Sequence, residues 1–396
     1  MFSLIKAASR KLKGIIQPTP LIFSSSFSNS FGFEVYLKLE NLQKTGSFKA
    51  RGAYNRLSAL TDDEKARGVV TASSGNHAQG VAWASTLLGV RSTIVMPETS
   101  PMIKQVATRG YGGDVILYGR SFDESYDHAT ALSREKGLTF IAPYDDNLVI
   151  AGQGTIGLEI MESIPDADTV VVPIGGGGLI SGIAVAVKGI NKGIKVIGVE
   201  ADASASCALS LKKGFPAGVE KRPTVADGIA VKRIGALTFP IIQKLVDDAV
   251  SVREDTIAAA ILKFIERKKL VVEGAGAVTL AAAMEGKLPA SAKKAVLVVS
   301  GGNIDVTALD RVIRLGLLRE GRIMRLTMVL PDVPGSLAGL TAGIASLKAN
   351  ILHILHQREA VDLPVGSAGI EVILEVEGPV HGKNVLKGLR GKGYEV

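Results

Sequence analysis

The stretch TVVVPIGGGGLISGIAVAVKG, residues 169–189, decides the fold. It begins as an apolar strand, passes through four consecutive glycines and ends in a helical pattern. Because glycine has no Cβ, the backbone N–H groups of this loop can converge on an anion at the start of the helix. We therefore expect a phosphate at Gly175, Gly176, Gly177, Gly178 and Leu179. A flexible turn is the alternative, and a dinucleotide site fits less well because no suitably placed acidic residue follows.

The segments on either side repeat the alternation of short strands and helical patterns. Strands are expected at residues 35–40, 68–73, 92–98, 114–119, 169–175, 195–200 and 294–302. Amphipathic stretches such as VAWASTLLG (81–89) and DTIAAAILKFIERKK (255–269) lie between them. This order predicts an α/β protein with parallel sheets covered by helices on both faces. Ligands of such folds bind where strands end and helices begin, so we expect a site between two α/β lobes.

Length and composition restrict the class of protein. The chain has 396 residues and a mass of 41.4 kDa. A chain of this length exceeds what a single hydrophobic core usually holds, so two or three domains are expected. Cys207 is the only cysteine, which excludes intrachain disulfides and Cys-rich metal sites. No apolar run has membrane-spanning length and the N-terminus lacks the apolar centre of a signal peptide, so we expect a cytoplasmic protein without a membrane partner.

The formal charge of +8 raises the question of a nucleic-acid partner. Basic residues are scattered along the sequence, and the one cluster near the start consists of Lys6, Arg10, Lys11 and Lys13. We assign this cluster to the solvated face of a helix. The sequence therefore predicts a small-molecule partner and no nucleic acid.

Lys49 lies in the stretch QKTGSFKARGA, residues 43–53. A lysine amine condenses with an aldehyde only when it is neutral, so burial or nearby positive charge must lower its pKa from about 10.4. Phe48 and the neighbouring small residues offer an apolar setting. A solvated lysine at a helix start is the alternative for this segment alone. Together with the glycine loop, SSGNHAQG (73–80) and SGGN (300–303), Lys49 indicates a Schiff base with pyridoxal 5'-phosphate.

The stretch SSGNHAQG, residues 73–80, is a second junction between a strand and a helix. Hydroxyls and free amides at this place suit a substrate carboxylate, and we assign that role to Ser73, Ser74, Asn76 and His77. Asn76 can also donate a hydrogen bond to a phenolic oxygen on the cofactor. A simple helix cap is the alternative, and it would be favoured if this segment stood alone.

Ser300 ends the apolar run KAVLVVS and is followed by Gly301, Gly302 and Asn303. If its hydroxyl meets the ring nitrogen of the cofactor, it supplies no permanent negative charge, so the ring nitrogen stays largely neutral. A weaker electron sink favours prompt loss of a β-substituent over transamination. The alternative is a serine that caps the strand end before a glycine turn.

Further motifs follow in order: TPL (19–21), IAGQGTIGLEI (150–160), TVADGIAV (224–231), LVDDAVSV (245–252), EGAGAV (273–278) and SGGNID (300–305). With the segments above, the first four fifths of the chain resembles the fold-type II pyridoxal phosphate enzymes, which are tryptophan synthase β-like. It is most similar to threonine ammonia-lyases (threonine dehydratases) and serine racemases. The resemblance implies that residues 1–320 form the catalytic domain, with a small lobe of about residues 45–148 inserted in the large lobe.

The resemblance also implies roles for single residues. Lys49 would carry the cofactor, Phe48 would pack at its ring, and Asn76 would meet the ring hydroxyl. Residues 175–179 would hold the phosphate and Ser300 would face the ring nitrogen. The implied reaction converts L-threonine to 2-oxobutyrate and ammonia after the freed Lys49 amine removes the Cα proton, and it converts L-serine to pyruvate as a side reaction.

Ser74 matches the serine that acts on the second face of the substrate in serine racemase, so some racemisation is an additional expectation. Serine dehydratase or serine racemase is the nearest alternative activity. An alternative of another class is a catalytically silent amino-acid sensor that keeps the fold.

Relatives bind two further kinds of ligand. Some hold a divalent cation at a glutamate that matches Glu200, but the second carboxylate position is Ser206 here, so we predict no metal. Nucleotide effectors of some relatives contact positions that match Thr45, Gln79, Tyr118 and Asn303. We carry these four positions over as an effector hypothesis.

The pattern of expected strands and helices in residues 321–396 differs from that of the preceding α/β segments. They read as strand, helix, strand, strand and helix, an order typical of a ferredoxin-like domain. The segment resembles an ACT domain, which implies an amino-acid effector such as isoleucine or valine near Pro334, Gly335 and Asn350. A turn that serves only dimerisation is the alternative. We expect a homodimer or homotetramer.

Overall fold

The computed structural model describes residues 1–220, 222–359 and 363–396. It divides the chain into two compact units, residues 1–305 and 306–396. Helix α14, Val306–Arg319, belongs to the second unit. The two-lobed α/β architecture with a small antiparallel domain confirms the predicted fold class.

The large lobe of the first unit is built on a six-stranded sheet with strand order β1-β2-β10-β7-β8-β9. All neighbours are parallel except β1 and β2. Every residue of β7 is buried, as expected for a parallel strand covered on both faces. The strands are β1 Leu21–Phe23, β2 Glu34–Leu39, β7 Thr169–Pro173, β8 Lys195–Ala201, β9 Asp248–Val252 and β10 Lys294–Val299.

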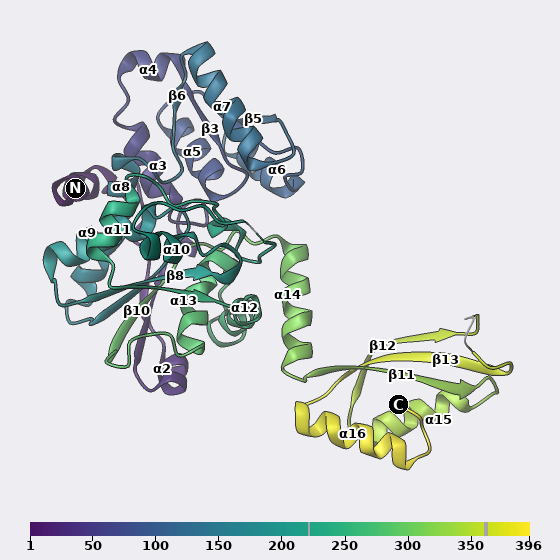
Figure 1. The fold of residues 1–396 in the computed structure, drawn as a ribbon. Helices are drawn as coiled ribbons and strands as arrows, with labels where there is room; N and C mark the ends of the chain where they lie inside the picture. The colour runs from purple at the N-terminus through teal and green to yellow at the C-terminus, as the bar shows by residue number, and fades with distance from the viewer. Residues whose placement is uncertain (221, 360–362) are drawn as a thin grey trace. The chain divides into compact units, whose positions relative to one another are not determined.

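Helices surround this sheet (Figure 1). They are α1 Phe2–Leu12, α2 Ser25–Phe31, α8 Asn147–Ser163, α9 Gly178–Ile190, α10 Ser206–Lys213, α11 Thr238–Leu245, α12 Glu254–Lys268 and α13 Gly274–Met284, with short turns η1 Glu40–Leu42, η2 Asp202–Ser204 and η3 Asp227–Ile229. Asp146 caps α8, because its Oδ1 accepts from the N–H groups of Leu148 at 2.7 Å and Val149 at 3.0 Å. Helices α8 and α9 pack backbone to backbone, since a Cβ on Gly182 would lie 2.4 Å from the carbonyl oxygen of Ile150.

The small lobe contains a parallel four-stranded sheet with strand order β5-β4-β3-β6. Its strands are β3 Val69–Ala72, β4 Ser92–Met96, β5 Asp114–Leu117 and β6 Thr139–Phe140, and its helices are α3 Lys49–Leu57, α4 Asp62–Arg67, α5 Asn76–Leu87, α6 Met102–Gly110 and α7 Phe122–Lys136. Strands β1, β6 and β9 were not predicted. The first two have three and two residues, and β9 begins with an exposed aspartate and has one fully buried residue, so none shows a strong apolar pattern.

The second unit has the predicted βαββα order: β11 Ile323–Pro331, α15 Ser336–Ser346, β12 Asn350–Gln357, β13 Ser367–Glu375 and α16 Pro379–Gly391. Its antiparallel sheet has the strand order β11-β13-β12. Both helices cover one face of this sheet (Figure 1). Leu326, Val372, Leu340 and Leu389 belong to the buried core between the sheet and the helices.

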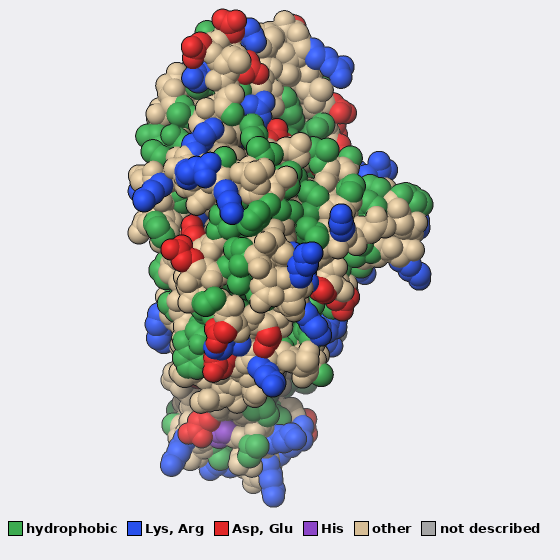
Figure 2. Space-filling view, turned by 90° about the vertical axis from the view of Figure 1, so that its left-hand side faces the viewer, with side chains coloured by type: hydrophobic (Ala, Val, Ile, Leu, Met, Phe, Trp, Pro, Cys, Tyr) green, Lys and Arg blue, Asp and Glu red, His purple; other side chains and the backbone are tan. Residues whose placement is uncertain are grey.

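Charge is dispersed over the one face of the molecule that Figure 2 shows. On the face that Figure 2 shows, lysine and arginine side chains stand singly or in small groups, with acidic, apolar and other residues between them. No helix in the described ranges combines the length and apolar character that a membrane crossing requires.

Candidate active site

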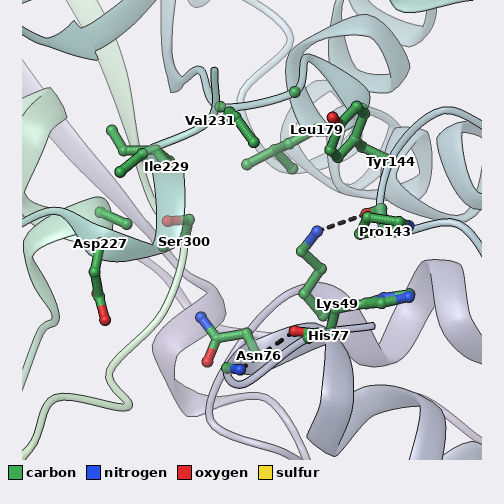
Figure 3. A pocket seen from close by; sticks show the side chains of 18 of the residues that line it. Lys49, Asn76, His77, Pro143, Tyr144, Leu179, Asp227, Ile229, Val231 and Ser300 are labelled. Carbon is green, nitrogen blue, oxygen red and sulfur yellow. Dashed lines mark hydrogen bonds between the residues drawn. The ribbon is translucent and has the colours of Figure 1, made fainter. Parts of the chain in front are cut away.

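One cavity of about 370 Å³ lies where three buried strands end and three helices begin. Strands β3, β7 and β10 point into it with their carboxyl ends, and helices α3, α5 and α9 start at its wall. Figure 3 shows residues from these segments facing one another around the space. The predicted junctions of strands and helices therefore meet in one place, except that η1 and a loop separate Lys49 from the end of β2.

Lys49 is the first residue of α3 and projects into the cavity. The loop before it pairs with the end of β10, because Phe48 N donates to Ser300 O at 3.1 Å and Gly302 N donates to Gly46 O at 2.9 Å. Lys49 Nζ donates to Pro143 O at 2.6 Å (Figure 3). Burial lowers the pKa of this amine to about 8, against a smaller opposing effect of Glu273. With this pKa about a tenth of the amine is neutral at pH 7, against well under one part in a thousand for an ordinary lysine.

The glycine loop forms the opposite wall, and Gly175 to Leu179 all line the cavity. Glycine is required here by close packing behind the loop. A Cβ on Gly176 would lie 2.3 Å from the ring of Tyr144, and Gly177 has φ +93°, which favours glycine. The first amides of α9, at Gly178 and Leu179, have no partner within the helix and can bind an anion.

The loop between β3 and α5 brings Ser73, Ser74, Asn76 and His77 to the cavity. Asn76 is fixed from both ends of its amide. Its Nδ2 donates to Glu273 Oε1 at 2.7 Å, and its Oδ1 accepts from Asn303 Nδ2 at 2.8 Å. Because an amide nitrogen carries two hydrogens, the second N–H of Asn76 can still donate to a ligand.

His77 is a neutral, buried ring. Burial first, and the nearby Lys49 second, lower its pKa to about 3. Its Nε2 lies 3.1 Å from the carbonyl oxygen of Ile141, which can only accept, so Nε2 carries the hydrogen. Nδ1 is then an acceptor, and it has no hydrogen-bond partner among the described residues. In this tautomer His77 carries no positive charge, and its Nδ1 is buried rather than exposed to a ligand in the cavity.

The structure brings most of the predicted residues together, and Phe48, Ser300, Gln79 and Asn303 also line the cavity. Thr45 is buried outside the lining and contacts it indirectly, since its carbonyl oxygen accepts from Asn303 Nδ2 at 2.7 Å. Tyr118 lies elsewhere on the small lobe, where its exposed ring stacks on His128 with centroids 3.8 Å apart. Pro334, Gly335 and Asn350 belong to the second unit.

Glu200 binds the backbone at the start of α10. Its carboxylate accepts from the N–H groups of Cys207 at 2.8 Å and Ala208 at 2.9 Å. Burial raises its pKa to about 7. Within the described residues, no three His, Cys, Asp or Glu side chains come together in the way a metal site requires.

Several lining residues were not singled out from the sequence. They are Glu273, Asp227, Tyr144, Pro143, Gln153 and Lys104. Glu273 is buried, and burial raises its pKa to about 7, with Asp227 adding to the increase. One signal was present in EGAGAV, where a single acidic residue directly precedes an apolar helix that is buried on all sides. Asp227 and Gln153 lie within the motifs TVADGIAV and IAGQGTIGLEI but were given no role, and Pro143, Tyr144 and Lys104 come from segments without a motif.

The cavity fits a phosphorylated aldehyde in three respects. It has a half-buried lysine whose amine has a lowered pKa, a close-packed glycine loop at a helix start, and an amide N–H of Asn76 that is free to donate. The fold and the cavity thus fit one class of protein, the α/β enzymes that depend on pyridoxal phosphate.

Comparison with known proteins identifies the family. Residues 12–301 match the family of pyridoxal-phosphate dependent enzymes, and the chain belongs to this family. It is 50% identical over 392 residues to the L-threonine ammonia-lyase of Thermotoga maritima, which covers 99% of this chain and 98% of that protein.

Solved structures agree with this assignment. The processed form of threonine deaminase isoform 2 from Solanum lycopersicum has a TM-score of 0.76 and 42% identity, covering 80% of this chain and 87% of that one. Maize serine racemase has a TM-score of 0.74 and 36% identity, covering 80% of this chain and 98% of that one. The predicted dependence on pyridoxal phosphate is confirmed by the family match.

The packing behind the glycine loop predicts the effect of one methyl group. In Gly176→Ala the new Cβ would overlap the Tyr144 ring, so the loop must move and its amides lose their alignment on the phosphate. We expect the apoprotein to bind pyridoxal phosphate at least about tenfold more weakly, a change of ~1.4 kcal/mol. Fluorescence titration of the apoprotein measures this affinity. Gly110→Ala, which places a methyl group in open space at the end of α6, is the control, and equal affinity in both variants would contradict the packing argument.

Proposed function

We propose that this protein is a threonine ammonia-lyase, which converts L-threonine to 2-oxobutyrate and ammonia by α,β-elimination and L-serine to pyruvate as a side reaction. The observation that carries the proposal is the buried Lys49 amine, which faces a glycine loop, Asn76 and Ser300 across one cavity. The similarity to the Thermotoga maritima enzyme over nearly the whole chain supports the choice of substrate.

The chain's own residues account for the proton transfer. The cofactor, when bound, withdraws electrons from the Cα of the substrate and so makes its proton acidic. Lys49 is the base for this proton, because its lowered pKa gives a neutral amine near the operating pH. The carbonyl oxygen of Pro143, 2.6 Å from Nζ, orients this amine. In our proposal, the Lys49 amine would remove the Cα proton and hold it.

Neutral groups hold the substrate and the cofactor ring in this proposal. Ser73 and Ser74 donate through their hydroxyls, and Asn76 through its backbone N–H at the start of α5, to the substrate carboxylate, and His77 forms the wall beside them. The second N–H of Asn76 serves the ring hydroxyl, and the Ser300 hydroxyl faces the ring nitrogen. Because a serine hydroxyl does not fix a positive charge on that nitrogen, the ring would draw less of the developing charge away from Cα. This favours loss of the β-hydroxyl, which takes up a proton and leaves as water, over transamination.

Serine racemase activity is the second candidate. It is favoured by Ser74, which lines the cavity at the start of the α5 loop, and by the similarity to maize serine racemase. A hydroxyl on the face opposite Lys49 can return a proton to Cα and invert its configuration. The catalytically silent sensor is not favoured, since Lys49, the glycine loop and Ser300 all line the cavity.

Turnover tests the proposal directly. Purified holoenzyme is incubated with L-threonine, L-serine and their D-isomers while keto acid release is followed. We expect 2-oxobutyrate from L-threonine, and a loss of about 100-fold or more in Lys49→Ala, since a positioned base contributes roughly 10²–10⁴-fold. No keto acid from any substrate would reject the enzyme in favour of the sensor. D-serine formed from L-serine by wild type but not by Ser74→Ala would establish racemisation, and no D-serine from either protein would reject it.

We further propose that the second unit is an ACT-like regulatory domain of a homo-oligomer. Pro334 in the turn and Gly335 with φ +95° support an amino-acid effector site at the start of α15. Asn350, whose Nδ2 donates to Glu375 Oε2 at 3.3 Å, begins β12 at the opposite end of the sheet and is kept as a separate proposed effector position. Thr45, Gln79, Tyr118 and Asn303 remain the proposed nucleotide-effector positions, although Tyr118 lies apart from the cavity.

The same turnover assay with isoleucine, valine or a nucleotide tests this regulation. We expect isoleucine or valine to change KM or kcat for threonine in the full-length protein, and we expect Asn350→Ala to lose at least about half of that response because the amide is removed. Light scattering of the same samples gives the number of subunits. A protein whose rate is indifferent to all three ligands would leave the second unit with an assembly role only.

A further inference from the structure

Arg51 lies two residues after Lys49 on helix α3, and its side chain is buried outside the cavity lining. Two residues correspond to about 200° around a helix, so the two side chains leave α3 on opposite sides. Arg51 is 1% exposed and Glu40 is 0% exposed. The pair is bidentate, since Nε and Nη2 of Arg51 each donate to a different carboxylate oxygen of Glu40 at 2.8 Å.

A second carboxylate completes a buried cluster of two cations and two anions. Glu159 of α8 accepts from Nη1 and Nη2 of Arg51, the latter at 2.9 Å, and also accepts from Lys38 of β2. Arg51 Nη1 donates in addition to Thr155 Oγ1 at 3.1 Å. This cluster, formed by Lys38, Glu40, Arg51 and Glu159, is the ionic clamp. It ties the first turn of α3 to β2 and η1 on one side and to α8 on the other.

The backbone of the same turn has little freedom to move. A Cβ on Gly152 of α8 would lie 2.7 Å from the carbonyl oxygen of Arg51, and a Cβ on Gly80 of α5 would lie 3.2 Å from that of Lys49. Gly52 N donates to Gln153 Oε1 at 3.2 Å. Close packing fixes the distance between α3 and its neighbours. The planar guanidinium of Arg51 fixes the rotation of α3 about its axis, because two carboxylates bind this guanidinium at once.

We propose that Arg51 is a positioning residue for the reaction: through the ionic clamp it sets the rotation of the first turn of α3 and therefore the place of Lys49 Nζ in the cavity. The inference rests on the proposed role of Lys49 as base and cofactor ligand. A lysine at position 51 would keep the charge but lose the planar fork, so it could not hold both carboxylates in the same geometry.

The test compares Arg51→Lys with the matched control Arg56→Lys. Arg56 lies on the same helix and also pairs with a carboxylate, its Nε donating to Asp146 Oδ2 at 3.1 Å, but it is seven residues from Lys49. We expect Arg51→Lys to lower kcat for threonine at least about tenfold with KM changed less than about threefold, whereas Arg56→Lys stays within about twofold in both.

A second readout does not depend on turnover. Apoprotein is mixed with pyridoxal phosphate, reduced with borohydride at set times, and the label on the peptide that contains residue 49 is measured by mass. We expect attachment in Arg51→Lys to be at least about tenfold slower than in wild type and in Arg56→Lys. A residue needed only for folding would lower the melting temperature of the variant without changing this rate in the folded protein.

Each outcome decides between the inferences. If folded Arg51→Lys keeps the wild-type kcat and attachment rate, the positioning role is overturned while the proposed function stands. If wild type itself attaches no cofactor at residue 49, the proposed function fails first. If Arg51→Lys does not fold, Glu159→Gln is tested in its place. This substitution keeps the ion pair between Arg51 and Glu40 and removes the negative charge of Glu159. It should lower kcat severalfold at unchanged KM, and an unchanged kcat would overturn the proposal.

Discussion

The burial of one amine is the constraint on which the rest of this structure depends. Transferring an ammonium out of water is costly, and at Lys49 this cost appears as a pKa lowered to about 8. The lowered pKa makes the amine reactive toward an aldehyde and useful as a base. The lowered pKa requires that α3, the helix carrying Lys49, is packed firmly against its neighbours. If the amine became exposed to water, its pKa would return to the ordinary value.

The other ionisable groups of the cavity follow the same rule. Burial moves the pKa of His77 to about 3 and that of Glu273 to about 7, so both groups spend much of their time uncharged near neutral pH. Glu273 also accepts a hydrogen bond from Asn76, and it is the largest electrostatic opponent of the shift at Lys49. A cavity with few full charges interacts strongly with the phosphate and carboxylate of its ligands, because little water screens them.

The sequence predicted those parts of the site that local patterns determine. The glycine loop, Ser73 to His77 and Ser300 each follow an apolar strand, and parallel strands bring their carboxyl ends to the same edge. Pro143, Tyr144 and Lys104 reach the cavity through loops and through the order of strands in the sheet, which no local pattern encodes. Anion binding at Gly176 stays a prediction, and no sequence pattern indicated that the ring of Tyr144 occupies the space behind it. Tyr118 was placed by resemblance alone, and the structure puts it away from the cavity.

The central claim is that residue 49 presents a neutral amine to the cofactor at moderate pH. Its most direct test is the pH dependence of cofactor attachment: apoprotein is mixed with pyridoxal phosphate at a series of pH values, reduced with borohydride, and the modified peptide is identified by mass. The account predicts a single labelled lysine, Lys49, whose initial rate of labelling rises with pH and levels off above about 8. Labelling at another lysine, or a rate that keeps rising to the ordinary lysine pKa of about 10.4, would contradict it.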